Sequence, residues 1–181
     1  MLIMIRSFLN RFRRDESGLS AVEFAIVVPI MLGFLLGSVE ISNGQLANRK
    51  VTQTTSTLAD LVAQDNSITN AEINDIFAAG IAVMYPTNTS TMKMRITAIN
   101  ADLNGVTTVG WSDGRNMPAR TVNGAITVPA GMITPGGSVI LTEIELDYTS
   151  PLGEVLTGPL HLKDQFYLRP RRSLRVARVP S

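Results

Sequence analysis

The sequence predicts an α+β protein: a long N-terminal transmembrane and stalk helix, then a small domain with one further helix and an antiparallel β-sheet. Three observations support this class. The first is one long apolar run at residues 19–39. The second is a helix-capping motif that precedes apolar residues at helical spacing in residues 69–84. The third is alternation of apolar and polar residues from Met92 onward, as in half-buried strands.

Residues 1–18 form a basic leader before the apolar run. The leader carries Arg6, Arg11, Arg13 and Arg14, whereas Arg49 and Lys50 follow the run only after an interval. Positive residues beside a membrane helix favour the cytoplasmic side. We therefore expect a cytoplasmic N-terminus and a C-terminal domain on the other side of the membrane.

The run at residues 19–39 has about the length that a helix needs to cross a bilayer. A cleaved secretory signal is the alternative, because the fully apolar stretch at residues 24–37 is short enough for a signal core. No convincing small-residue cleavage site follows that stretch, so we favour a retained anchor. Within the run, Glu23 is a candidate functional residue, because a carboxylate at membrane depth is costly. Gly18 stands at the junction between the leader and the run, and this arrangement indicates a pilin-type assembly signal.

Residues 40–65 are predicted to continue as a helical stalk, and residues 66–181 as the α+β domain. The threonine-rich stretch at residues 52–57 weakens helix propensity, so a break there is one alternative. The next helix starts at a capping box formed by Thr69 and Glu72 and ends before Pro86.

The rest of the chain is predicted to form strands joined by loops. Asn104 and Gly105 indicate a hairpin turn, and Asp113 begins a loop of turn-forming residues. The predicted strands are residues 92–98, 106–112, 125–128, 138–148, 160–168 and 174–179. In the strand at residues 138–148, Glu143, Glu145 and Asp147 alternate with apolar residues and are expected on a solvated outer face.

The residues that catalysis usually requires are sparse. The chain has no cysteine, and His161 is its only histidine, which excludes disulfides, thiolate metal sites and multi-histidine metal sites. The segment that begins at Asp102 resembles the start of a calcium-binding loop, but the later ligands of such a loop are absent. A turn explains these residues better. We expect no enzyme activity, no cofactor, no metal, no small-molecule substrate and no nucleic-acid partner.

The C-terminal arginines allow two interpretations. They could bind phosphate or lipid head groups, or they could blunt the edge of a final strand, and we favour the edge strand. These arginines are Arg169, Arg171, Arg172, Arg175 and Arg178.

Residues 11–47 resemble the TadE-like family of the tight-adherence (Tad) pilus system. The matching motifs are RRDESG at 13–18, AVEFA at 21–25, VP at 28–29 and GSVE at 37–40. Supporting similarity lies at residues 109–112, 128–131, 143–149 and 167–171. The resemblance implies a pseudopilin-like or minor-pilin-like protein of the bacterial inner membrane, with one membrane helix and a periplasmic domain.

The resemblance also implies a site for prepilin peptidase between Gly18 and Leu19, which would make Glu23 the fifth residue of the processed chain. Phe24 stands where Tad pilins prefer tyrosine, so the chain departs from the pilin motif there. Cleavage would leave an amine at Leu19, and Glu23 of a neighbouring subunit could pair with it, since either charge alone is costly in an apolar core.

The implied partners are the prepilin peptidase, other Tad pilins and pseudopilins, and the assembly-platform proteins. The implied role is assembly of an adhesion pilus used in surface attachment and biofilm formation. A signal-anchored periplasmic binding module unrelated to pili is the runner-up, and a periplasmic enzyme is the third hypothesis.

Overall fold

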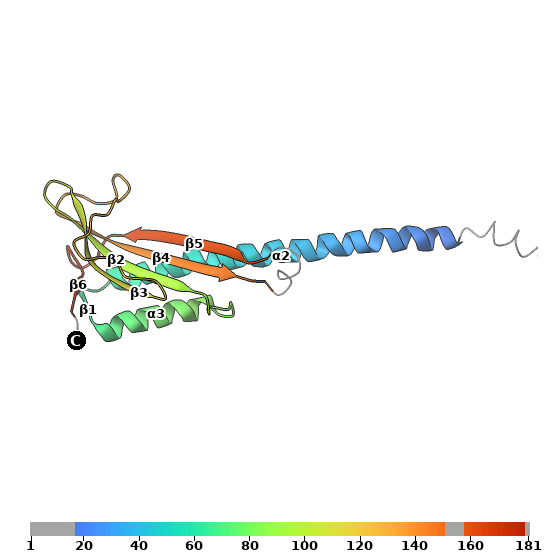
Figure 1. Cartoon of the computed structure of the whole chain (residues 1–181), viewed down its shortest axis with the longest axis horizontal. Helices are drawn as coiled ribbons and strands as arrows, with labels where there is room; N and C mark the ends of the chain where they lie inside the picture. The colour runs from blue at the N-terminus through green and yellow to red at the C-terminus, as the bar shows by residue number, and fades with distance from the viewer. Residues whose placement is uncertain (1–16, 151–157, 180–181) are drawn as a thin grey trace, which may run out of the picture. The chain divides into compact units, whose positions relative to one another are not determined.

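The computed structural model describes residues 17–150 and 158–179. The four leader arginines therefore lie outside the described residues. The elements follow the order α2 (Ser17–Ala63), β1 (Ser67–Ile68), α3 (Asn70–Met84), β2 (Lys93–Ala101), β3 (Thr107–Arg115), β4 (Ser138–Tyr148), β5 (Leu160–Leu168) and β6 (Ala177–Arg178). Figure 1 shows this succession of a long helix, a shorter helix and a sheet. The predicted α+β class is confirmed.

The chain divides into two compact units, Met1–Ser42 and Asn43–Ser181. The described part of the first unit is the beginning of α2, which continues as a helix through Pro29. Among the described residues, α2 is the one helix that is long and apolar enough to cross a membrane. The predicted N-terminal apolar helix is thus confirmed, and its character suggests membrane anchoring.

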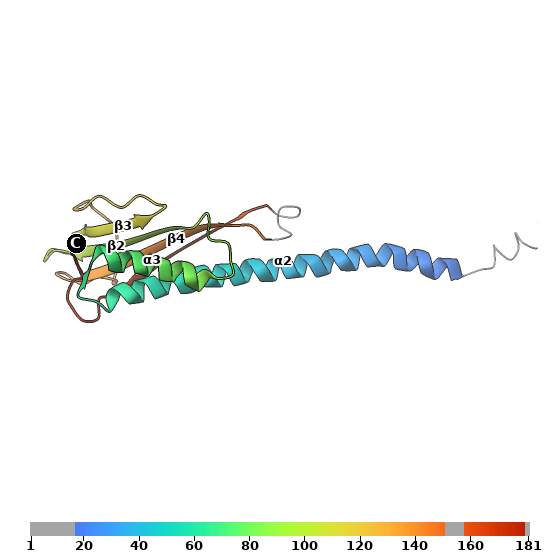
Figure 2. The ribbon, with the colours of Figure 1, turned by 90° about the horizontal axis from the view of Figure 1, so that it is seen from below.

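The second unit is built on a four-stranded antiparallel sheet with the order β3-β2-β4-β5. Helix α3 and the C-terminal part of α2 run side by side, as Figure 2 shows. They approach closely at Gly80, where an added Cβ would lie 3.1 Å from a methyl group of Leu58. A side chain at this position would require the ends of Leu58 and Met94 to shift, because its Cβ would lie 3.1–3.2 Å from them.

The main core lies between these helices and the sheet. Leu58 and Val62 of α2 contribute to it, as do Phe77 of α3, Ile96 of β2 and Ile144 of β4. Burying each such side chain stabilises the fold by roughly 1.5–3 kcal/mol. From Val51 onward, one face of the predicted stalk helix is therefore part of this core.

The threonine-rich stretch does not break α2. Thr54 and Thr55 are fully buried. Their hydroxyls donate to the carbonyls one turn earlier, at 2.8 Å to Lys50 and 2.7 Å to Val51. These bonds satisfy hydroxyl groups that would otherwise compete with the helix backbone, so core packing outweighs the low helix propensity.

Helix α3 begins as predicted. Thr69 is the N-cap, its side chain accepts from the Glu72 N–H, and the Glu72 carboxylate accepts from the Thr69 N–H at 2.8 Å. The predicted hairpin turn is also present, because Gly105 has φ of 82° between β2 and β3. A positive φ strains residues other than glycine, which explains this residue at the turn.

Strand β3 is longer than predicted. The loop expected from Asp113 is wrong, because β3 continues to Arg115 and pairs there with the start of β2. Asp113 and Gly114 are turn formers locally, but ladder pairing with Arg95 and Ile96 overrides that preference.

Two predicted strands are reduced. In residues 125–128, Ala125 forms only an isolated bridge to Thr108. In residues 174–179, only β6 is a strand, and it pairs in parallel with β1 instead of lying at the edge of the main sheet. Val176 is buried and its carbonyl accepts a hydrogen bond from the Trp111 indole at 2.8 Å, so this segment is held by the core.

Candidate functional site

The predicted processing and assembly residues all lie near the start of α2. The helix begins at Ser17, so Gly18 and Leu19 are in its first turn. Leu19 is 62% exposed and Phe24 is 70% exposed. An added Cβ at Gly18 would meet no described atom within 4 Å, so packing among the described residues does not explain a glycine here.

Glu23 lies one helical turn after Leu19, on the same face of α2. Helical Cα–Cβ bonds tilt toward the N-terminus, so the Glu23 side chain extends over the Leu19 turn. Glu23 is exposed. The helix thus presents a carboxylate close to the position where cleavage would create an amine.

The same part of α2 presents large apolar side chains on every side. The exposed ones include Leu19, Val22, Phe24, Ile26, Val27, Ile30, Met31, Leu32, Phe34, Leu35, Leu36, Val39 and Ile41. A helix that is apolar all round needs an apolar environment, such as lipid or neighbouring helices. Ser38 and Ser42 are compatible with that environment, because the Ser38 hydroxyl donates to Leu35 O and the Ser42 hydroxyl to Ser38 O, both at 2.8 Å.

The second unit contains a partly buried charge cluster that the sequence did not predict. Glu143 of β4 accepts from Arg95 Nε at 2.7 Å and from Arg95 Nη2 at 2.9 Å. Arg120 Nη2 donates to both carboxylate oxygens of Glu143, at 2.8 and 3.0 Å. The cluster links the sheet to the segment after β3. Arg95 also donates to Pro118 O at 3.2 Å, which strengthens that link.

This cluster corrects the expected solvated outer face of β4. Glu143 is buried, Glu145 is half-buried and Asp147 is exposed. Burial by itself would raise the pKa of Glu143, but the hydrogen bonds and charges of Arg95 and Arg120 outweigh it and hold this pKa below its usual value. The alternation of apolar and charged residues in β4 identifies the face of the sheet on which Glu143 lies. The sequence contained no signal that the segment after β3 covers this face.

His161 lies in an exposed pair on β5. It is opposite Asp147 in the ladder, and its Nδ1 lies 2.6 Å from Asp147 Oδ1. The hydrogen bond from His161 lowers the pKa of Asp147. This geometry makes His161 one half of a cross-strand pair on the surface of the sheet.

The Asp102 turn is confirmed. Asp102 Oδ1 accepts from the N–H groups of Asn104 at 2.9 Å and Val106 at 2.8 Å. The carboxylate therefore organises its own loop, as in an Asx turn. Within residues 17–150 and 158–179, no group of three or more His, Cys, Asp and Glu side chains is placed to hold a metal ion.

The C-terminal arginines mostly bond to the domain itself. Arg178 donates to Asp113 Oδ2 at 2.8 Å and to Asn70 Oδ1 at 2.6 Å, and Arg171 pairs with Asp60 at 2.5 Å. Arg169 donates to the carbonyls of Met132 at 3.0 Å and Gly131 at 3.1 Å. These bonds correct the expectation of an edge strand that is merely blunted by charge.

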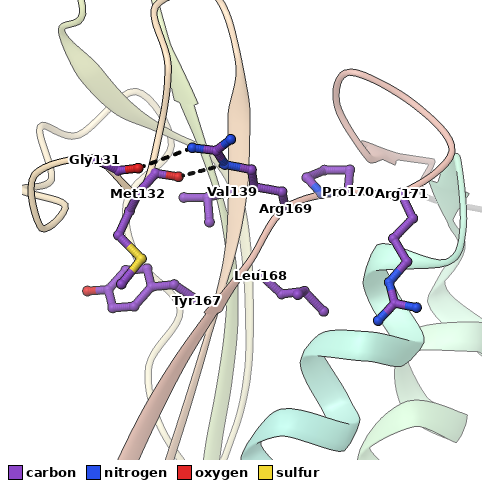
Figure 3. Close-up of a pocket in the computed structure, with 8 residues that line it drawn as sticks. All are labelled: Gly131, Met132, Val139, Tyr167, Leu168, Arg169, Pro170 and Arg171. Carbon is purple, nitrogen blue, oxygen red and sulfur yellow. Dashed lines mark hydrogen bonds between the residues drawn. The ribbon is translucent and has the colours of Figure 1, made fainter.

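Arg169 and Arg171 border a shallow pocket. Figure 3 shows that Arg169 points to the two loop carbonyls, whereas Arg171 points away from Arg169. The diverging guanidinium groups do not converge on a common anion. Tyr167 and Met132 lie on the same side of the pocket as Arg169. The hydrogen bonds of Arg169 to Gly131 and Met132 therefore join the loop before β4 to the end of β5.

Residues 18–60 match the family model described as TadE-like protein. No curated protein and no solved structure matches the chain. The matched segment contains Gly18, Leu19, Glu23 and Phe24, together with the exposed apolar part of α2 and part of its buried face. The resemblance predicted from the sequence is confirmed. Residues 18–60 of the chain are thus similar to a TadE-like protein, and this similarity suggests a membrane protein associated with the Tad pilus system.

Proposed function

We propose that this protein is a membrane-anchored, pseudopilin-like or minor-pilin-like component in the assembly of a Tad-type adhesion pilus. The observation that carries the proposal is the TadE-like match, which includes Gly18, Glu23 and an apolar helix exposed all round. The role is structural and not enzymatic. It serves secretion of the pilus, surface attachment and biofilm formation.

The proposed location is the bacterial inner membrane, with the N-terminus in the cytoplasm and the C-terminal domain in the periplasm. Its support is the arginine-rich leader, which carries more positive charge than the segment after the apolar run. Prepilin peptidase, other Tad pilins and pseudopilins, and assembly-platform proteins are the proposed partners.

In the proposed mechanism, peptidase cuts between Gly18 and Leu19 and leaves an amine at Leu19. Glu23 of a neighbouring processed subunit then pairs with that amine, or with a charged group of the assembly machinery. Each charge is costly alone in an apolar environment, and pairing offsets this cost. Such a pair also fixes the axial register of neighbouring helices, because only one offset brings the two charges together.

The test compares Glu23→Ala with Gly18→Ala in cells. Glu23→Ala removes a charge from an apolar helix, so the variant should insert and accumulate normally but lose association with the pilus machinery and surface attachment. Gly18→Ala should instead block cleavage, because the peptidase site depends mainly on this glycine. Co-purification, attachment assays and intact-mass measurement from native membranes provide the readouts.

Ser38→Ala is the matched control, since it changes a polar residue of the same helix and removes only a hydrogen bond to Leu35 O. It should leave processing and attachment unchanged. Normal attachment by Glu23→Ala at the wild-type protein level would refute the pairing mechanism. A native mass that begins at Met1 would favour the alternative, a signal-anchored periplasmic binding module unrelated to pili.

A further inference from the structure

The end of the second unit that follows the apolar segment contains a groove. Asn43, Leu46, Ala47 and Lys50 of α2 line one wall, Pro86, Thr87 and Asn88 line another, and Tyr148 and Thr149 complete it. None of these lining residues is acidic. The groove lies entirely within the second unit, between the start of its helix, the loop after α3 and the end of β4.

Large side chains beside this groove are unusually exposed. Tyr85, next to Pro86, is 81% exposed, and Leu46 is 57% exposed. Leu46 lines the groove and Tyr85 precedes Pro86, which also lines it, so both residues present apolar surface beside the groove. Tyrosine is enriched where proteins meet the interface between membrane and water, because its ring is apolar and its hydroxyl is polar.

Positive charge lies on the same helical face. Arg49 and Lys50 follow Leu46 by three and four residues, which places them on its side of α2. Arg49 is exposed. Lys50 Nζ donates to Tyr85 O at 2.5 Å and is 3.5 Å from Met84 O, and an ammonium group has a third donor to offer.

Chain connectivity places the first residue of this groove close to the end of the predicted span. Asn43 follows Val39, the last residue of the predicted span, by four residues. A chain of four residues extends at most about 14 Å. The headgroup layer on each side of a bilayer is roughly 5–7 Å thick, so Asn43, at the edge of the groove, lies at most roughly 10 Å beyond the outer limit of that layer.

We propose that this end of the domain docks on the headgroups of an anionic phospholipid bilayer. Leu46 and Tyr85 contact the interface, while Arg49 and Lys50 face lipid phosphates. The inference rests on the membrane anchor and is independent of the pilus role. It gives the domain a preferred face toward the membrane.

The test uses the full chain in lipid vesicles. The chain has no cysteine, so Asn88→Cys and Leu103→Cys each provide one labelling site for an environment-sensitive fluorophore. Asn88 lines the groove. Leu103 is 87% exposed beyond the far end of β2, whose nine residues extend roughly 30 Å. Lipids that carry a headgroup spin label act as the quencher.

We expect strong quenching at position 88 and little at position 103 in vesicles that contain phosphatidylglycerol. Replacing phosphatidylglycerol with phosphatidylcholine should weaken the quenching at position 88. Arg49→Gln should lower the ratio of docked to undocked domain about fivefold, because one basic residue near an anionic surface contributes about that much to binding. Arg172→Gln is the matched control, since it removes an exposed arginine next to Arg171, whose N–H bonds to Ala63 O at the other end of α2.

Three results would overturn the proposal. Equal quenching at the two positions would show that the domain has no preferred face. Absence of quenching at position 88 would show that the groove does not meet lipid and is left for a protein partner. If quenching at position 88 did not change with lipid charge or with Arg49→Gln, the membrane anchor alone would explain why the groove lies near the lipid. Each of these outcomes leaves the pilus proposal untouched, since that proposal depends on Glu23 and Gly18.

Discussion

At the residue scale, Glu143 shows how environment changes the role of a charged side chain. Two arginines hold its carboxylate from different parts of the chain, one on the neighbouring strand and one on the segment that covers the sheet. Taking a carboxylate out of water is costly, and the two ion pairs offset that cost. The cluster thereby fixes how the covering segment lies on the sheet.

Glu143→Gln should destabilise the fold at neutral pH by about 3 kcal/mol, because it leaves two partly buried guanidinium groups without their counter-charge. Thermal and denaturant unfolding of the full chain in detergent would measure this difference. Glu145→Gln is the control on the same strand. Its carboxylate is 3.4 Å from an exposed Lys163 ammonium, so its removal should cost less than about 1 kcal/mol.

The effect of Glu143→Gln should depend on pH. The pKa of Glu143 in the folded protein lies below its ordinary value of 4.5, so its ionised form stabilises the fold above about that pH. This stabilisation is lost as the pH falls through the folded pKa. The difference between wild type and variant should therefore shrink in acid, and a difference that grew in acid would contradict the assignment.

Single residues were predictable from sequence only where their chemistry is local. The alternation of β4 correctly separates Glu143 from Ile144, but the burial of Glu143 depends on Arg120, which lies in a loop. The roles of Gly18, Leu19, Glu23 and Phe24 stay predictions. Their chemistry requires a peptidase and a neighbouring subunit, and a single chain contains neither.

At the element scale, the elements predicted best are those whose signals lie within their own sequence. The capping box of α3 needs only Thr69 and Glu72, and the structure contains both of its hydrogen bonds. The end of β3 was missed because Asp113 and Gly114 favour turns, whereas pairing with β2 decides their conformation. The strand predicted at residues 174–179 was too long. The alternation of apolar residues and arginines there reflects the burial of Val176 in the core and the bond of Arg178 to Asp113.

Thr69→Ala should destabilise the fold by about 1 kcal/mol, because it removes the side chain that caps the first turn of α3. Denaturant unfolding followed by circular dichroism would measure the loss. Thr57→Ala is the matched control on α2, since its hydroxyl bonds only to Gln53 O of its own helix in an exposed position. Equal losses in the two variants would argue that the cap contributes nothing specific.

At the scale of the whole molecule, the sequence was sufficient for the class of fold and for the long N-terminal apolar helix. Both follow from hydrophobic patterning: a continuous apolar run in the first unit, then helical and alternating spacing in the second. The division at Ser42 was less visible, because α2 is continuous across it. The large apolar side chains before Asn43 are exposed, whereas later ones are buried on one face, and the buried positions Val51, Leu58 and Val62 are widely spaced among polar residues.

The orientation in the membrane is the prediction that applies to the whole chain. A reporter that is active only in the periplasm, fused after Ser181, should be active, because the arginines before the apolar run are expected to keep that flank in the cytoplasm. A reporter that is active only in the cytoplasm should be inactive at the same position.

Replacing Arg6, Arg11, Arg13 and Arg14 with glutamine should reduce the bias, since Arg49 and Lys50 would then be the nearest positive residues. Replacing Arg169 and Arg172 instead should leave orientation unchanged, because charge far from the membrane helix contributes little. Activity of the cytoplasmic reporter in the unmodified chain would reverse the assignment and place the groove beside Tyr85 on the cytoplasmic leaflet.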